Sequence, residues 1–130
     1  MLVWTGFKPN IEGYSADPAV RAFVSELRRT KPDADTFNQF TQGAYVGMQF
    51  LVDALRRMGP DVTRARLRAA LDATSYSSGL TIQPSLKFTG ATRYANVTMQ
   101  AFTMQYKGTS GSWRTGVIRT DPRPEAGAKE

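Results

Sequence analysis

One long stretch, from Ala34 to Gly59, constrains the fold of this chain more than any other. Its apolar residues recur every three or four positions, which is the spacing of one buried face of an α-helix. Asp33 or Asp35 can cap its start, because a carboxylate there accepts backbone N–H bonds, and Gly59-Pro60 ends it. The pattern predicts a helix over about 35–58 whose main buried face consists of Phe37, Phe40, Ala44, Met48, Leu51, Leu55 and Met58.

The same helix carries a second apolar face, on which Val46 and Phe50 lie between Gly43 and Gly47. Small residues four positions apart let another element approach closely. This face either packs inside the same fold or forms a subunit interface, because an exposed apolar face must be covered by something. The residues predicted for such an interface in a homo-oligomer are Gly43, Val46, Gly47 and Phe50.

Two shorter helices flank the long one. Asp17-Pro18 predicts the start of a helix over about 17–31, with Asp17 as its N-cap and proline in the first helical position. Thr63 is the expected N-cap of a helix over about 63–73, and Val62 is expected to act as its hydrophobic staple.

The last third of the chain changes to the period of β-strands. Apolar and polar residues alternate over about 96–107, and a strand over about 113–118 returns after a glycine- and serine-rich turn, which predicts a hairpin. Shorter strands are expected at Leu2–Trp4, at about 80–82 and at about 85–88. Residues 119–130, with two prolines and few apolar side chains, are expected to be a disordered tail.

Three helices followed by a C-terminal β-hairpin region predict the α/β class. Residues 1–118 form one expected domain, and 130 residues with 41% apolar composition suffice for a real core. The chain opens in a strand and has few strands, so we expect an incomplete α/β unit cut from a larger protein.

The composition excludes several kinds of chemistry. The chain has no cysteine and no histidine, so thiolate chemistry, the commonest zinc ligands and the commonest general base are absent. No nucleophile–base pair and no phosphate-binding glycine loop is visible, so we predict no enzyme activity, no metal site and no cofactor. The net charge of +6 permits nucleic-acid binding, but Arg64, Arg66 and Arg68 spread over a wide arc of a helix, which disfavours it.

The order of the segments is what points to a family. DPAVRAFVSELRRTKP precedes a long helix that contains Gly-Ala-Tyr, and ALRRMGPDVTRARLRAALDAT follows it. A Gly-Leu-Thr loop, the segment LKFTG and a hairpin ending on Gly-Ser-Trp come last. This order resembles the C-terminal portion of the type I periplasmic substrate-binding proteins of ABC transporters, which bind branched-chain amino acids and amides, over roughly Pro9 to Val117.

The resemblance implies a fold of two α/β lobes joined by three crossovers, without catalytic activity. The ligand, an amino acid or amide, is held between the lobes and passed to a membrane permease. The implied location is periplasmic, although the N-terminal residues lack the pattern of a secretory signal. Because the chain offers at most one wall of the cleft, we expect it to bind small ligands weakly or not at all by itself.

One position of the family's cleft maps onto this chain. Phe40 corresponds to a cleft-facing aromatic residue five positions before the helix tyrosine, which is Tyr45 here. The family often has aspartate after that tyrosine, whereas this chain has Val46. Phe40 is therefore either a cleft contact or a core residue. The neighbouring polar residues either bind the ligand or form a solvated first turn; they are Asn38, Gln39 and Gln42.

Two other functions fit the same residues. A receptor or regulator can use this fold as a ligand-sensing domain, and a neighbouring transmembrane or kinase segment would identify it. A small basic nucleic-acid-binding protein is the third reading, and steep salt dependence in a gel shift would favour it.

Overall fold

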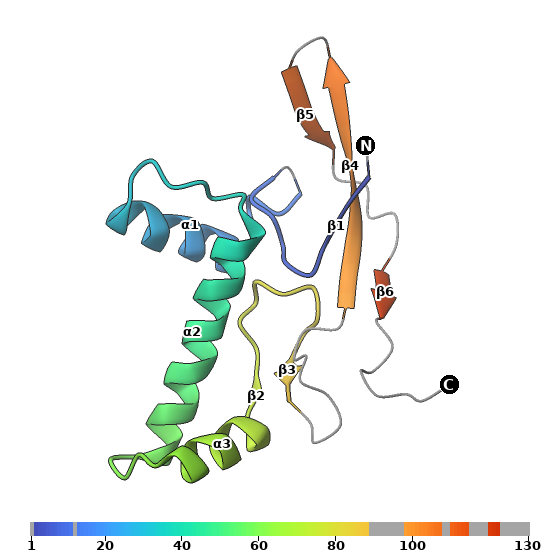
Figure 1. Ribbon diagram of the computed structural model, residues 1–130. Helices are drawn as coiled ribbons and strands as arrows, with labels where there is room; N and C mark the ends of the chain where they lie inside the picture. Colours follow the sequence, from blue (N-terminus) through green and yellow to red (C-terminus); the bar gives the residue numbers. More distant parts are fainter. Residues whose placement is uncertain (1, 12, 89–97, 108–109, 115–119, 123–130) are drawn as a thin grey trace.

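The computed structural model describes every residue except 1, 12, 89–97, 108–109, 115–119 and 123–130. The described residues form three helices, one larger sheet and a two-stranded ribbon. Figure 1 shows the helices beside the sheet, with the ribbon between them. The helices are α1 (Pro18–Thr30), α2 (Gln39–Met58) and α3 (Arg64–Ala73). The strands are β1 (Leu2–Thr5), β2 (Ser75–Tyr76), β3 (Leu86–Lys87), β4 (Thr98–Lys107), β5 (Ser110–Arg114) and β6 (Thr120–Pro122).

The larger sheet is built around β4, and all its described pairings are antiparallel. β1 pairs along one edge, with Leu2 opposite Thr103. β5 and β6 pair along the other edge, because Thr103 also faces Arg114, and Gln100 faces both Thr5 and Thr120. The predicted hairpin is thus confirmed as β4–β5, together with the predicted α/β class of three helices followed by a hairpin region. Its second strand begins at Ser110, inside the predicted turn, instead of at Trp113, and residues 115–118 of the predicted strand lie outside the described residues.

Two predictions for the strands are wrong. The segment at 80–82 is not a strand and forms one isolated bridge, between Thr81 and Phe7. The expected tail contains β6, whose Thr120–Pro122 pair with β4. Proline is tolerated there because an edge strand leaves one side of its backbone unpaired. The remainder of that expected tail, 123–130, lies outside the described residues.

The start of α1 follows its local sequence. Asp17 is the N-cap, and its Oδ1 accepts hydrogen bonds from the backbone N–H groups of Ala19 at 2.8 Å and Val20 at 3.4 Å. Nζ of Lys8 donates a 2.8 Å hydrogen bond to Asp17 Oδ2. This bond lowers the pKa of the Asp17 carboxyl; burial opposes the shift, and the two backbone bonds add to it. The predicted cap therefore also ties the loop after β1 to α1.

The position and the buried face of α2 differ from the prediction. The helix begins at Gln39 with Asn38 as its N-cap, not near Asp35, whose Oδ1 accepts from the backbone N–H of Phe37 before the helix starts. The residues that α2 buries are Gln42, Val46, Phe50 and Ala54. Phe40 is 81% exposed and Met48 58% exposed, and no residue of the stripe predicted as the main core face is buried.

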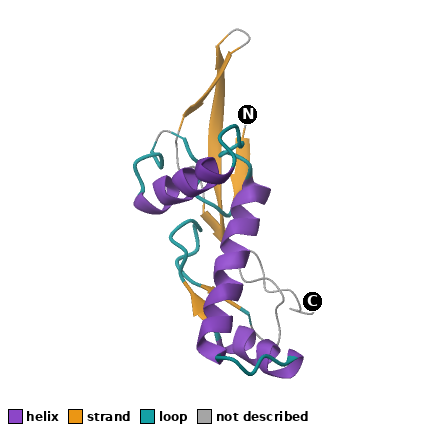
Figure 2. Ribbon diagram, turned by 90° about the vertical axis from the view of Figure 1, so that its left-hand side faces the viewer, coloured by secondary structure: helices purple, strands orange, loops and turns teal. Residues whose placement is uncertain are grey.

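The core lies where α1, α2 and the β2–β3 ribbon meet. Figure 2 shows α1 near the start of α2 and α3 at its end. The buried cluster is Val20, Phe23, Val46, Phe50, Leu80 and Leu86. Two partly buried aromatic residues pack against this cluster through edge-to-face ring contacts. The ring centroids of Phe23 and Tyr45 are 5.2 Å apart, and those of Phe50 and Phe88 are 5.4 Å apart. Such pairs stabilise beyond the burial of their area.

α3 buries fewer side chains than α1. Oγ1 of Thr63 accepts a 3.2 Å hydrogen bond from the backbone N–H of Arg66, which confirms the predicted N-cap. Val62 is 56% exposed, so the predicted hydrophobic staple is absent. α3 has no buried residue, and Leu67, Ala70 and Leu71 are half-buried. The short helix therefore covers the end of α2 without entering the core.

Candidate functional site

The predicted ligand-binding residues surround the start of α2. Oδ1 of Asn38 accepts hydrogen bonds from the backbone N–H groups of Phe40 at 2.9 Å and Thr41 at 3.4 Å. Two donors of the first turn are therefore already used, which weakens this helix end as a site for an anionic group. Gln39 and Phe40 are both exposed. The interpretation of Phe40 as a core residue is therefore wrong.

Gln42 does not share this exposure. It is 1% exposed, and its Nε2 donates a 2.8 Å hydrogen bond to the backbone carbonyl of Lys8, 34 residues earlier in the chain. Buried polar groups require such partners, since an unpaired one is costly. Gln42 therefore attaches the loop after β1 to α2. In this it differs from Asn38, Gln39 and Phe40, which are exposed.

Gln42→Met is expected to lower the free energy of unfolding by about 1–3 kcal/mol, because the carbonyl of Lys8 loses its donor while the side-chain length is kept. Urea unfolding followed by circular dichroism measures the loss. Gln39→Met, the same change at an exposed position on the same helix, serves as the control and should shift stability by less than about 0.5 kcal/mol. Equal effects of the two changes would contradict a structural role for Gln42.

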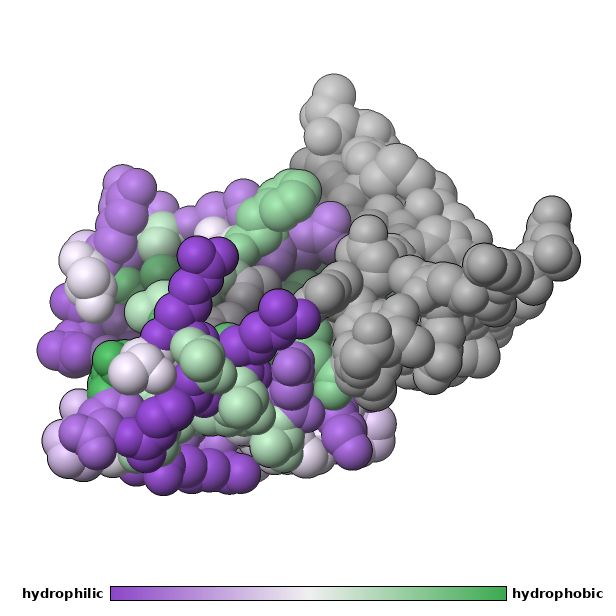
Figure 3. Space-filling model, turned by 60° about the horizontal axis from the view of Figure 1, so that its bottom comes forward, coloured by the Kyte–Doolittle hydropathy of each residue, from purple (hydrophilic) through white to green (hydrophobic). Residues whose placement is uncertain are grey.

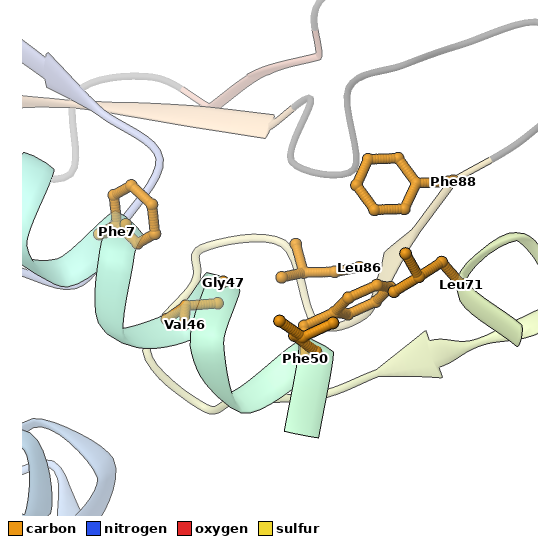
Figure 4. Close-up of a pocket in the computed structure, with 9 residues that line it drawn as sticks. Phe7, Val46, Gly47, Phe50, Leu71, Leu86 and Phe88 are labelled. Carbon is orange, nitrogen blue, oxygen red and sulfur yellow. The ribbon is translucent and has the colours of Figure 1, made fainter. Parts of the chain in front are cut away.

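The four residues predicted for a subunit interface all line one apolar hollow of about 330 Å³. Figure 4 shows Phe7 at one end of it and Phe88 at the other, with Phe50 and Leu86 between them. Val46 and Phe50 are buried in the core of their own chain, whereas Gly43 is half-buried and Gly47 is exposed. The lining offers no polar side chain, so this hollow does not suit a polar solute. Self-association through it stays a prediction.

A second hollow, of about 390 Å³, mixes polar and apolar groups between α2 and β2. It is lined by Tyr45, Met48, Gln49, Val52, Asp53, Arg56 and Tyr76. None of these belongs to the predicted ligand residues. The α2 members recur every three or four positions, so the sequence places them on one stripe. Tyr76 joins them only through the packing of β2 against α2.

The basic residues of the described segments are dispersed. Ion pairs join Lys8 to Asp17, Arg29 to Glu26, Arg57 to Asp53, Arg66 to Asp61 and Arg68 to Asp72. Figure 3 shows hydrophilic and hydrophobic side chains intermixed over the face that it displays.

The described segments hold no group of three or more carboxylates placed to ligate a metal ion. None of the helices in this part of the chain is both long enough and apolar enough to span a membrane.

A family described as periplasmic binding protein matches residues 1–111. No curated protein and no solved structure matches the chain.

Proposed function

We infer a solute-binding role for this chain, because it belongs to the periplasmic binding protein family. Members of this family generally bind small molecules without catalysing a reaction, and the family implies a periplasmic location. The absence of histidine and cysteine accords with a binding role.

We propose further that the ligand is an amino acid, an amide or a related polar molecule, and that the protein delivers it to the permease of an ABC transporter. In this proposal the chain belongs to a type I binding protein and supplies part of one cleft wall. The start of α2 is the section of wall that contacts the ligand. Phe40 supplies apolar contact, and Gln39 and the Nδ2 of Asn38 supply hydrogen bonds.

The exposure of Phe40 is the observation that carries this proposal. Its ring is 81% exposed although it lies in the first turn of a helix that buries Val46 and Phe50 further along. Exposed apolar patches that are rimmed by polar residues mark sites of contact with a ligand or a partner, and Phe40 is proposed as the apolar part of such a patch. Here Asn38 and Gln39 are the polar neighbours, both exposed.

A titration of the isotope-labelled chain with amino acids and amides, followed by NMR chemical shifts, tests the proposal. We expect saturable shifts at residues 38–41 with dissociation constants in the millimolar range, because one wall provides only part of the contacts. Phe40→Ala should abolish them, whereas Met48→Ala, an exposed apolar residue two turns further along α2, should not. Micromolar binding would contradict the single-wall interpretation, and the absence of any shift at residues 38–41 would contradict the site.

A further inference from the structure

We propose that the apolar hollow on α2 binds a small apolar molecule of two fused rings. Every described residue that lines this hollow is apolar, and its volume is about 330 Å³. The site is separate from the start of α2, where the polar ligand of the proposed function is placed, and from the mixed hollow beside β2. It therefore goes beyond the proposed function, because an apolar lining disfavours the polar molecules expected at the start of α2.

Separate segments of the chain converge on this hollow, so it is a concavity and not one face of a helix. Phe7 comes from the loop after β1, Phe50 from α2, Leu71 from α3 and Leu86 from β3. Figure 4 shows Phe88 at the end opposite Phe7. Sites for small molecules are typically concave, mostly apolar and formed before the ligand arrives.

The core of the chain fixes the walls of the hollow. Val46, Phe50 and Leu86 line it and are buried members of the core cluster. The rings of Phe50 and Phe88 meet edge to face, with 5.4 Å between their centroids. Close-packed side chains keep their conformations, so little binding energy is lost in ordering these walls around a ligand.

Two glycines of α2 keep the hollow open. A β-carbon at Gly43 would lie 3.5 Å from Cζ of Phe7, so the lack of a side chain lets this ring lie against the helix. A β-carbon at Gly47 would meet no described neighbour within 4 Å. Gly47 is also exposed, so the space beside it is continuous with solvent and gives a ligand a way in.

The volume of the hollow sets the size of the ligand. An apolar cavity of about 150 Å³ stays dry and binds benzene. At about 330 Å³ the hollow has roughly twice that volume, so a single ring leaves part of it empty and two fused rings fill it. A planar aromatic molecule suits the rings of Phe7, Phe50 and Phe88, because edge-to-face and offset contacts between rings add to the gain from burial.

Charged residues beside the hollow favour a small molecule over a second copy of the chain. Asp72 directly follows Leu71, and Lys87 stands between Leu86 and Phe88. Both charged residues are exposed, so they interrupt the apolar surface around the opening. The centres of protein–protein interfaces are depleted of charged residues, and an interface of standard size covers about 800 Å² on each partner. A concavity of this size between charges is better matched by a compact ligand.

A titration of the isotope-labelled 130-residue chain with 1-methylindole, followed by NMR chemical shifts, tests the proposal. 9-Methylpurine is the matched probe, because it has the same fused frame with three ring CH groups replaced by nitrogen acceptors. We expect saturable shifts at residues 46–51, Leu71 and Leu86, with a dissociation constant of about 1 mM or tighter for 1-methylindole. Binding of 9-methylpurine should be at least about 10-fold weaker, because its nitrogen atoms lose their hydrogen bonds to water in the hollow.

Filling the hollow assigns the site. Gly47 has lining residues of α2 one turn before and one turn after it, so Gly47→Leu places a side chain in the open space without removing any core group. This variant should lose the saturable shifts while its circular dichroism spectrum stays that of the wild type. Ala44→Leu introduces the same side chain at an exposed position of α2 outside the lining and should leave binding unchanged, as should Phe40→Ala. Intermolecular NOEs from 1-methylindole to the methyl groups of Leu71 and Leu86 in the wild type assign the site independently of any variant.

Several outcomes would overturn the proposal. They are equal binding of the two probes, unchanged binding by folded Gly47→Leu, and the lack of a saturable shift at residues 46–51. Shifts confined to residues 38–41 would overturn it too, while leaving the solute-binding role intact. In sedimentation equilibrium, a wild-type dimer that Gly47→Leu converts to a monomer would assign the hollow to a second copy of the chain instead. Conversely, amino acids and amides that fail to shift residues 38–41 would contradict the proposed function only.

Discussion

Replacing Phe50 by alanine is expected to lower the free energy of unfolding by about 3–5 kcal/mol, the usual cost of removing a buried phenylalanine ring. Phe50 is 6% exposed, and its ring makes edge-to-face contacts with Tyr76 and Phe88. The change would remove the ring that joins α2 to the β2–β3 ribbon. Because single domains have only about 5–15 kcal/mol of stability, the loss should be visible as a large drop in the urea midpoint.

Phe40→Ala is the matched control, since it makes the same change on the same helix ten positions earlier. At an exposed position we expect a change of less than about 0.5 kcal/mol. The pair also decides between the two apolar faces of α2. A large loss for Phe40→Ala with a small one for Phe50→Ala would support the face predicted from the sequence and contradict the packing described above.

Gly79→Ala should be the most costly substitution among the described glycines, at about 2–5 kcal/mol. Gly79 has a φ of +73°, a conformation that costs an L-residue about 1–2 kcal/mol. A β-carbon at this position would also lie 2.8 Å from the Cβ of Ala19 in α1, closer than two carbon atoms can approach. Relieving that overlap adds about 1–3 kcal/mol. The position fixes the turn that brings Leu80 into the core against α1.

Gly47→Ala is the control for that change, and its sign should be opposite. Gly47 lies inside α2, and a β-carbon there would meet nothing within 4 Å. Alanine should then stabilise the chain by about 0.5–1 kcal/mol, because glycine loses more backbone entropy in a helix. Thermal and urea unfolding of both variants measure the difference. Destabilisation by Gly47→Ala would show that another part of the chain or a second copy occupies this face.

Capping residues, whose effect is limited to the neighbouring one or two helical turns, predict the helix ends well. Asp17 with Pro18 marks the start of α1, Thr63 the start of α3, and Gly59 the end of α2. Each works because capping and φ restrictions depend on neighbouring residues only. The start of α2 is misjudged because several capping residues stand close together, and Asn38 takes the role instead of Asp35.

Some residues of the candidate sites can be identified from the sequence, whereas others depend on partners that are distant in the chain. The resemblance to type I binding proteins predicts Phe40 as a cleft contact, and its 81% exposure leaves the side chain accessible to a ligand. Gln42 stands two positions away and cannot be distinguished from a ligand contact by sequence, because its partner is the carbonyl of Lys8 in a distant loop. The hollow with Gln49, Asp53 and Tyr76 forms only because β2 lies beside α2. The local sequence of either segment does not predict this contact.

By itself the sequence determines the class of the fold, the ends of most helices, the hairpin and the lack of histidine or cysteine chemistry. Only the tertiary structure decides which side of α2 is the inside. Both faces of that helix are apolar, so periodicity alone cannot rank them. The choice is made by α1, the loop after β1 and the β2–β3 ribbon, which bury Val46 and Phe50 and leave Phe40 and Met48 in solvent. Burial is a property of what packs against a residue, and those partners lie far away in the chain.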